Sequence, residues 1–231
     1  VATGLMASKS AARRSIDEGG AYLGFRGVGS DVTEARESNE KIAYLARYDT
    51  LTGLPNRLML NEALRDALKF AEQWRTRCAF LMLDLDRFKA VNDSRGHQVG
   101  DHLLAEVSGR LKELMDENAM CGRLGGDEFA CVVGFEPGNR EKVDILVERL
   151  INSASLPIMV EGLALDITIS VGIASNDPDT RSTPSVLDAQ CLMHHADIEM
   201  YHAKKQGKNR HYWFEAAMEN ELRFRSELEA G

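Results

Sequence analysis

Two adjacent glycines, Gly125 and Gly126, separate two apolar segments, and this arrangement constrains the fold more than any other feature. Residues 119–121 (AMC) precede the pair, and residues 129–133 (FACVV) follow it. Short apolar segments on either side of a two-residue turn predict a β-hairpin. Two acidic residues, Asp127 and Glu128, then stand at the mouth of a hairpin that is otherwise suited to burial.

The simplest register of this hairpin pairs Leu124 with Asp127. Cys121 and Cys131 would then occupy adjacent ladder positions on opposite faces of the sheet. We therefore expect no disulfide between them. The chain has four cysteines and no CxxC pair, which argues against a zinc site or a redox motif.

The remaining chain alternates helical and extended patterns. The run 78–83 (CAFLML) suits a central strand, because it is continuously apolar. We expect an α+β fold with a central, mostly antiparallel sheet flanked by helices. The expected helices are 56–74, 98–116, 139–154 and 185–207, the last closed by Gly207, and the other expected strands are two within 157–175 and one at 210–214.

The ends of the chain have a different character from this core. Residues 21–31 predict a strand that ends in a Gly-rich turn, and residues 32–48 predict a helix with Asp31 as its N-cap. Residues 215–230 predict a charged helix. We expect 1–48 and 215–231 to be connecting segments outside the core.

Bulk composition limits the kinds of partner. The net charge is −8 and the sequence contains no long basic run, which argues against binding of nucleic acid through its phosphates. The sequence has no apolar run of membrane-spanning length, so we expect no direct membrane contact by this fragment. We expect a cytoplasmic fragment, whose parent protein could be tethered to a membrane through a missing segment.

Acidic residues follow the expected central strand as well as the hairpin turn. If the two strands are neighbours, Asp84 and Asp127 meet at one edge of the sheet. Two close carboxylates stay ionised when a cation neutralises them, and hard oxygen ligands favour Mg²⁺ or Mn²⁺. The alternative is that they are ordinary turn and strand-end acids that face water.

Other polar residues allow two interpretations each. Asp101 could accept the N1–H and N2–H₂ donors of guanine, a donor pair that adenine lacks, or complement the dipole of a first helical turn. His97 taken alone suits a structural hydrogen bond. Lys204 and Lys208 could bind phosphates or complement the C-terminus of the long helix.

Six motifs occur together, in an order and at a spacing that resemble the GGDEF domain of diguanylate cyclases. The resemblance covers about residues 47–214, and we place the domain itself at 49–214. It implies a palm-like nucleotidyl cyclase core with the order βαββαβ. The motifs are DTLTGLPNR, DLDRFKAVND, GHQVGD, RLGGDEF, ISVGIA and ADIEMYHAKKQGKNR.

The resemblance also implies roles for individual residues. The metal ligands would be the carboxylates of Asp84 and Asp127 and the backbone carbonyl of Leu85, holding Mg²⁺ or Mn²⁺. Asp127 would also accept a proton, with Glu128 as its acidic neighbour, and Lys89 would stabilise the transition state. The residues expected to contact substrate are Phe88 in the phosphate loop, Asn92 and Asp101 at guanine, His97, Gly125 and Gly126 against the nucleotide, and Lys204 and Lys208 at the phosphates.

The activity implied by the resemblance is condensation of two GTP molecules into cyclic di-GMP with release of two pyrophosphates. Each domain would hold one GTP, so a homodimer is needed for catalysis. The alternative is a regulatory module that binds GTP and controls a fused cyclic-di-GMP phosphodiesterase. Residues 1–48 resemble the last strand and exit helix of a PAS domain, and 215–231 resemble a linker to an EAL domain, so we expect a piece of a PAS–GGDEF–EAL protein.

One family motif is replaced in this chain. Many such cyclases carry an RxxD motif for product inhibition, with the Arg nine residues before the first glycine of the turn. Here that stretch reads Asp116-Glu117-Asn118-Ala119. The resemblance therefore implies no product inhibition through this motif.

Overall fold

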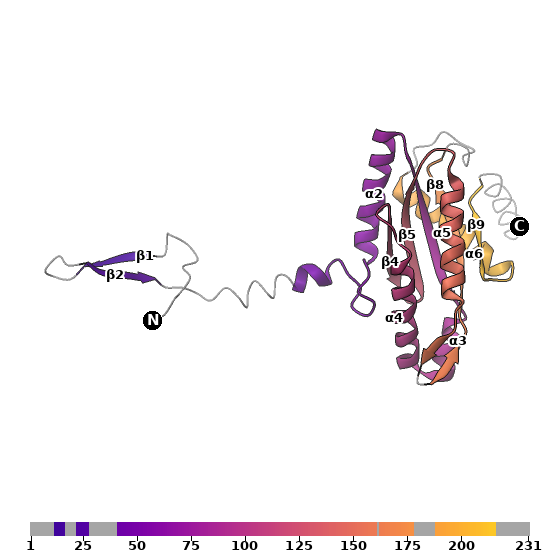
Figure 1. The fold of residues 1–231 in the computed structure, drawn as a ribbon, viewed down its shortest axis with the longest axis horizontal. Coiled ribbons are helices and arrows are strands. Elements are labelled where there is room, and N and C mark those ends of the chain that lie inside the picture. The colour runs from indigo at the N-terminus through magenta and orange to yellow at the C-terminus, as the bar shows by residue number, and fades with distance from the viewer. Residues whose placement is uncertain (1–11, 17–21, 28–40, 161, 178–187, 216–231) are drawn as a thin grey trace, which may run out of the picture. The chain divides into compact units, whose positions relative to one another are not determined.

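The computed structural model describes residues 12–16, 22–27, 41–160, 162–177 and 188–215 (Figure 1). They fall into two compact units, Val1–Tyr44 and Leu45–Gly231. In the first unit, β1 (Ala12–Ile16) pairs antiparallel with β2 (Tyr22–Gly27), which is the strand expected within 21–31. The sequence analysis does not anticipate β1.

Both terminal helices expected from the sequence are only partly visible. Residues 41–45 are helical, whereas the remainder of the expected 32–48 helix before residue 41, with Asp31, lies outside the described residues. The expected helix at 215–230 lies almost wholly outside them.

A five-stranded sheet organises the second unit, with the order β4-β5-β3-β8-β9 (Figure 1). All neighbours are antiparallel except β8 and β9, which are parallel. This arrangement confirms the expected mostly antiparallel sheet. The strands are β3 (Arg77–Asp86), β4 (Ala119–Gly125), β5 (Glu128–Phe135), β8 (Thr168–Ser175) and β9 (Arg210–Trp213).

Helices cover both faces of this sheet and enclose two apolar cores. The first core lies against α4 (His97–Glu113) and α5 (Arg140–Ala154). The second core lies against α2 (Arg57–Trp74) and α6 (Ala189–Lys205). The helices begin and end close to the positions that periodicity predicts, and Gly207 follows α6 with φ +117° as expected.

The central strand β3 contributes to both cores, which explains its continuous apolar run. Leu81, Leu83 and Leu85 lie in the first core, and Phe80 and Met82 in the second. Side chains alternate along a strand, so the polar continuation of the Phe80–Met82 face is Asp84 and then Asp86. Both acids are therefore on the α2/α6 side of the sheet.

A glycine on β8 determines how closely α6 approaches the sheet. A Cβ at Gly172 would collide with the backbone of Ala196 and Met200 on α6. No side chain is tolerated there, because backbone atoms of the helix already occupy the space. The close approach brings the C-terminal end of α6 to the end of β3, where Asp84 lies.

The hairpin register differs from the expected one. Gly125 pairs with Glu128, and an irregularity between Arg123 and Gly125 absorbs one residue in β4. Cys121 consequently lies directly opposite Cys131, where the simple turn had placed them on opposite faces. The expected placement on opposite faces is therefore wrong, and both thiols are free and buried in the first core.

Two further segments differ from the sequence expectation. Residues expected in a phosphate loop form a short helix, α3 (Phe88–Arg95), which begins after Arg87 with a left-handed φ of 63°. The segment 157–175 holds three strands instead of two. A small sheet of β6 (Ile158–Val160) and β7 (Leu163–Leu165) precedes β8, because Asp166 and Ile167 interrupt the extended run.

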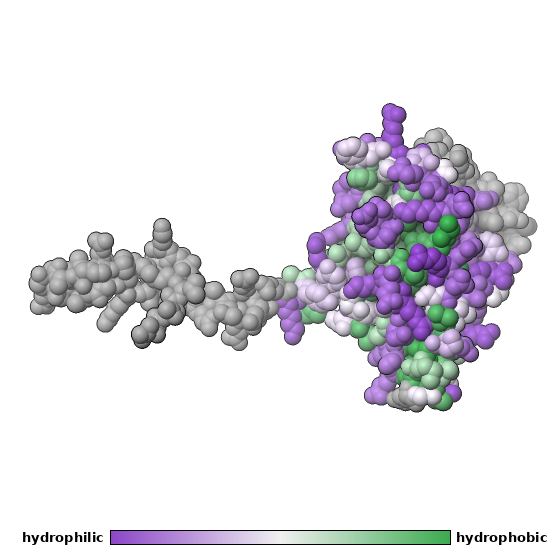
Figure 2. Space-filling view, in the orientation of Figure 1, coloured by the Kyte–Doolittle hydropathy of each residue, from purple (hydrophilic) through white to green (hydrophobic). Residues whose placement is uncertain are grey.

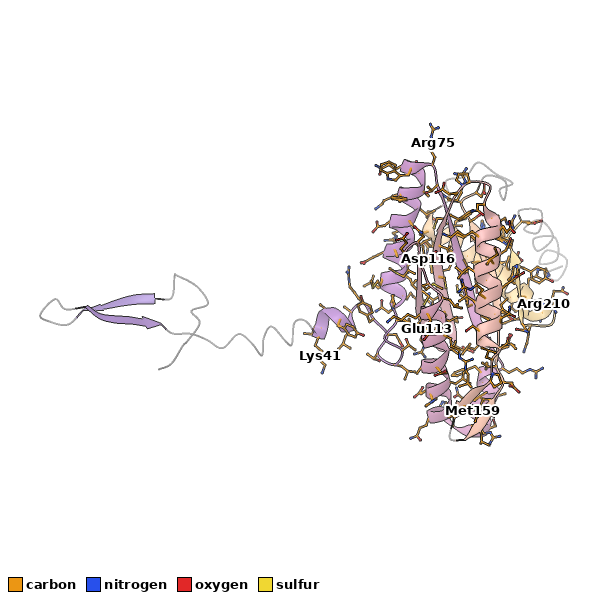
Figure 3. The ribbon with its side chains drawn as sticks, viewed as in Figure 1. Lys41, Arg75, Glu113, Asp116, Met159 and Arg210 are labelled. Carbon is orange, nitrogen blue, oxygen red and sulfur yellow. The ribbon has the colours of Figure 1, made fainter. Side chains whose placement is uncertain are left out.

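The visible face in Figure 2 is largely hydrophilic over the helices, with small hydrophobic areas between them. Arg75, after α2, and Met159, on the β6–β7 hairpin, lie at opposite ends of this unit (Figure 3). Within the described ranges, no helix has the length and apolar character needed to cross a bilayer.

Candidate active site at the edge of the sheet

Acidic residues from two neighbouring strands meet where the hairpin turns. Asp84 on β3 pairs with Glu128 on β5 in the ladder. The next residue of β3, Leu85, donates its N–H to the carbonyl of Asp127 at 3.2 Å. Because N–H and C=O of one strand residue point to the same side, the carbonyl of Leu85 also faces the turn. The neighbouring strands that the sequence analysis assumed are therefore present.

Lys204, in the last turn of α6, reaches this acidic edge. Its Nζ lies 2.7 Å from Oδ2 of Asp84, whose side chain is 8% exposed. Burial raises the pKa of Asp84 to about 6, against the lowering effect of Lys204, and the charges of Asp127 and Glu128 raise it further. Burial therefore outweighs the adjacent lysine, and three carboxylates share this region with one close cation.

The two glycines of the turn leave open space beside these acids. Gly125 has φ +142° and Gly126 has φ +54°, which is the positive-φ turn expected from the sequence. A Cβ at either position would meet no atom within 4 Å. The backbone of the turn is therefore accessible to a ligand lying against it.

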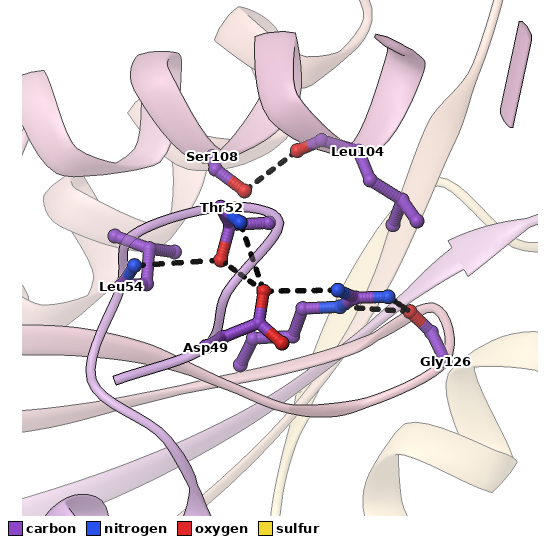
Figure 4. Close-up of polar contacts among 7 residues, drawn as sticks. Asp49, Thr52, Leu54, Leu104, Ser108 and Gly126 are labelled. Carbon is purple, nitrogen blue, oxygen red and sulfur yellow. Dashed lines mark hydrogen bonds and ion pairs between the residues drawn. The ribbon is translucent and has the colours of Figure 1, made fainter. Parts of the chain in front are cut away.

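An arginine of the hairpin ties this turn to the segment before α2 (Figure 4). Arg123 donates to the carbonyl of Gly126 from Nε at 3.0 Å and from Nη2 at 2.7 Å, while its Nη1 lies 3.0 Å from Asp49 Oδ1. Asp49 also accepts hydrogen bonds from the N–H and hydroxyl of Thr52. Burial raises the pKa of Asp49, but these hydrogen bonds and Arg123 outweigh it and leave the pKa lowered.

The residues expected to read guanine lie near one another at α3 and α4. Asn92 packs its amide oxygen against Gly100, and a Cβ at Gly100 would collide with that oxygen. This oxygen is buried and has no hydrogen-bond partner among the residues that the structure describes. Asp101 follows Gly100 and is exposed, beyond the first turn of α4, which argues against the helix-dipole interpretation of this acid.

The other residues expected at the site differ in how far they are exposed. Phe88 is buried in the first core beneath α3, whereas Lys89 and His97 are exposed. Lys208 follows α6 with φ 66° and is partly exposed. The structure thus brings Asp84, Asp127, Glu128 and Lys204 together, and in the part of the chain that it describes no hydrogen bond or ion pair joins Lys89, His97 or Lys208 to that group.

Several functional residues are missed by sequence reasoning. Asp86, to which the sequence analysis assigns no role, is buried and accepts hydrogen bonds from Thr168, Ser170 and the N–H of Asn209. Asp49 and Arg123 belong to quoted motifs, but the sequence did not indicate that they pair, since 74 positions separate them.

The donor set limits what metal the site can hold. Within the described part of the chain, no three His, Cys, Asp or Glu side chains converge on one metal position. Asp84, Asp127 and the carbonyl of Leu85 provide hard oxygen donors and excess negative charge, which fits Mg²⁺ or Mn²⁺ with water and substrate phosphates completing the sphere. The residues present therefore fit such an ion.

Comparison with known proteins agrees with this geometry. The family model described as the diguanylate cyclase GGDEF domain matches residues 46–210. The chain belongs to this family. The GGDEF match includes every site residue named above, from Asp49 to Asn209.

Relatives of this GGDEF domain occur within longer proteins. It is 38% identical over 188 residues to the bifunctional diguanylate cyclase/cyclic di-GMP phosphodiesterase MucR of Pseudomonas aeruginosa, covering 80% of this chain and 26% of MucR. It is 33% identical over 180 residues to the cyclic di-GMP phosphodiesterase PdeR of Escherichia coli, covering 78% of this chain and 26% of PdeR. The chain thus spans about a quarter of the length of these relatives.

Solved GGDEF structures have the same fold. The GGDEF domain of TpbB from Pseudomonas aeruginosa superposes with a TM-score of 0.68 at 33% identity, covering 76% of this chain and 99% of that one. The coiled coil and GGDEF domain of DgcB from Caulobacter crescentus, solved in complex with c-di-GMP, gives 0.68 at 28% identity, covering 80% and 94%.

Proposed function

We propose that this GGDEF domain is a diguanylate cyclase, which condenses two GTP molecules into cyclic di-GMP and releases two pyrophosphates. The observation that carries the proposal is the convergence of Asp84, Lys204 and the Gly125–Gly126 turn at one edge of the sheet. Carboxylates, a lysine and an open backbone are the groups needed to hold a metal-bound triphosphate.

Each catalytic group has a defined task in this proposal. Asp84, Asp127 and the Leu85 carbonyl hold Mg²⁺ or Mn²⁺, which when bound neutralises phosphate charge and lowers the pKa of a hydroxyl. Asp127 accepts the proton of the attacking 3′-hydroxyl, with Glu128 beside it. Lys89, at the start of α3, stabilises the charge that develops on the α-phosphate.

The substrate is held at its two ends by different residues. Lys204 and Lys208 bind the phosphates, His97, Gly125 and Gly126 line the path of the nucleotide, and Phe88, buried in the first core, supports the segment that faces the phosphates. Asn92 and Asp101 select guanine. The oxygen of Asn92 has no partner among the described residues but packs against Gly100, so the side chain would turn away from Gly100 to accept from the base.

The reaction needs two copies of the domain. Each 3′-hydroxyl attacks the α-phosphate of the other GTP, so one domain provides half of the catalytic centre. We propose that a homodimer performs catalysis, and that PAS-like and EAL domains of a parent chain regulate it. The bifunctional relative MucR supports this context. We place the fragment in the cytoplasm, where GTP is available.

A second function is favoured by one of the relatives. PdeR is named as a phosphodiesterase, yet this chain is similar to it over 180 residues. The domain would then bind GTP through the same residues without condensing it and control a fused phosphodiesterase. Lys208 supports this alternative, because lysine lacks the bidentate fork of the arginine frequent at this family position.

The two functions can be distinguished by making the domain dimeric, so that two copies can form one catalytic centre. The chain is fused to a dimerising coiled coil, supplied with GTP and Mg²⁺, and compared with the unfused chain. A cyclase forms cyclic di-GMP and pyrophosphate in the dimeric form. A regulatory module binds GTP in calorimetry but forms no product in either form.

A further inference from the structure

Asp86 is the last residue of β3 and is 4% exposed. Its Oδ1 accepts a hydrogen bond from Ser170 Oγ at 2.7 Å, and its Oδ2 accepts from Thr168 Oγ1 at 2.7 Å and from the N–H of Asn209 at 3.1 Å. A buried carboxylate needs such donors, because burial without them is costly. Two of the donors come from β8, and the third comes from the loop after α6.

That loop has an unusual backbone. Gly207, Lys208 and Asn209 have φ values of +117°, +66° and +49°. Non-glycine residues adopt positive φ at a cost and keep it when surrounding contacts enforce it. The backbone contacts here are the N–H of Lys208 on the carbonyl of Ala203 at 3.0 Å, and the N–H of Asn209 on Asp86, while the side-chain oxygen of Asn209 accepts from Ser155 Oγ at 3.1 Å. Asp86 therefore supplies the bond that fixes the loop to the sheet.

We propose that Asp86 is a positioning residue for the phosphate-binding lysines, a role that rests on the proposed GTP-binding function. Asp84 and Asp86 lie two residues apart on the α6 side of β3. Asp84 contacts Lys204 directly, and Asp86 holds the backbone next to Lys208. The spacing of the DLD motif thus fixes both cations relative to the metal-binding edge.

The test replaces Asp86 by Asn, which keeps its shape but turns part of an acceptor into a donor. The amide group of Asp86→Asn cannot accept from all three donors, so the loop loses its attachment. We expect the amide hydrogen of Asn209 to exchange faster and the affinity for GTP with Mg²⁺ to fall about tenfold, the value of one charge-assisted contact to phosphate.

A double-mutant cycle distinguishes a role of Asp86 in positioning Lys208 from a general role in the stability of the fold. Lys208→Ala removes the cation that Asp86 positions, so Asp86→Asn adds little to the loss of affinity in a Lys208→Ala background. Asp144→Asn is the matched control. Asp144 accepts a hydrogen bond from Trp213 Nε1 at 2.6 Å, and this contact is with β9 and not with the lysine-bearing loop.

Faster exchange at Asn209 together with non-additive loss of GTP affinity supports the role. Independent, additive losses in the cycle, or unchanged GTP affinity despite a loosened loop, overturn it. Unchanged exchange at Asn209 in a folded Asp86→Asn protein overturns it as well. Absence of GTP binding by the unmodified chain contradicts the proposed function, whereas the exchange experiment still decides whether Asp86 holds the loop.

Discussion

Lys204 Nζ lies 2.7 Å from Asp84 Oδ2, so a cation expected to bind phosphate is paired with an acid expected to bind metal. Asp127 and Glu128 add negative charge to the same edge. In the nucleotide-free protein, the lysine therefore offsets part of the repulsion among these acids. A metal–nucleotide complex carries both a cation and phosphate groups. When it binds, Asp84 can contact the metal and Lys204 the phosphates in place of their contact with each other.

Replacing Lys204 by Met tests the importance of this pair. We expect GTP affinity to fall about tenfold or more, since a contact between a cation and phosphate is lost. The unliganded protein also loses stability, because Asp84 is left beside two other acids without its counter-charge. Calorimetry with GTP and thermal unfolding measure the two effects.

The neighbouring Lys205 provides the matched control for this substitution. Lys205 is exposed and lies over the ring of Tyr201, 5.2 Å from its centroid. Lys205→Met removes the same charge from the same helix end without touching Asp84. Equal losses in both variants would mean that general electrostatics, and not the Asp84 contact, governs GTP binding.

Asp127→Asn should abolish formation of cyclic di-GMP while leaving the fold intact. The variant removes a charge from the metal site and a proton acceptor from the reaction, yet Asp127 is partly exposed in a turn. Product is measured by chromatography and the fold by circular dichroism. Asp66→Asn, an exposed acid on α2, is the control, and full activity of a folded Asp127→Asn protein would rule out the assignment.

The Asp49–Arg123 pair should make stability depend on pH at the acidic end. The pKa of Asp49 is lowered in the folded protein from an ordinary value of 3.8, so its contribution is present above pH 3.8 and is lost as the pH falls below it. Asp49→Asn should cost about 1–3 kcal/mol at neutral pH.

Urea unfolding at several pH values checks this prediction. The difference in unfolding free energy between the parent chain and Asp49→Asn should be constant from pH 5 to 7, roughly one to three units above the ordinary Asp pKa. It should shrink as Asp49 takes up its proton. A difference that grows on acidification would contradict the lowered pKa.

The chain should bind GTP in preference to ATP. In the proposed site Asn92 and Asp101 accept hydrogen bonds from the base, and adenine cannot supply the adjacent donors of guanine, so polar groups would stay unpaired. Competition titrations should show ATP binding weaker by a factor of at least about 10. Asp101→Ala should reduce GTP binding and leave ATP binding nearly unchanged, whereas equal affinities in the parent chain would refute the assignment.

Cyclic di-GMP should not inhibit this domain through the usual motif. Asp116 occupies the position of the arginine and forms an ion pair with Lys142 at 3.5 Å, which offsets a nearby cation that could attract the product. Ala119 offers no side-chain hydrogen bond. Addition of product to a steady-state assay should leave the rate unchanged, and Asp116→Arg with Ala119→Asp should introduce inhibition.

The alternation of apolar residues was sufficient to predict most of the fold, because strands such as β3 bury both faces and helices such as α5 bury one stripe. It did not predict the register of the hairpin, since a single absorbed residue in β4 is invisible in the pattern. The short helix α3 was also missed, because eight residues carry little periodic signal.

The candidate site was likewise predicted in part from the sequence. The family motifs identified Asp84, Asp127 and Lys204, and the structure brings these together. The supporting contacts of Asp49 with Arg123, and of Asp86 with Asn209, join residues that are far apart in the chain. Such pairs depend on how the helices and loops pack against the sheet, which a single sequence does not encode in any local pattern.

The dependence of the rate on chain concentration tests the central claim most directly. If each domain is half of a catalytic centre, the initial rate of cyclic di-GMP formation per chain rises with concentration in the unfused protein and becomes independent of it in a coiled-coil dimer. A rate per chain that is constant across all concentrations of a protein shown to be monomeric, or a dimer that binds GTP and forms no product, would contradict it.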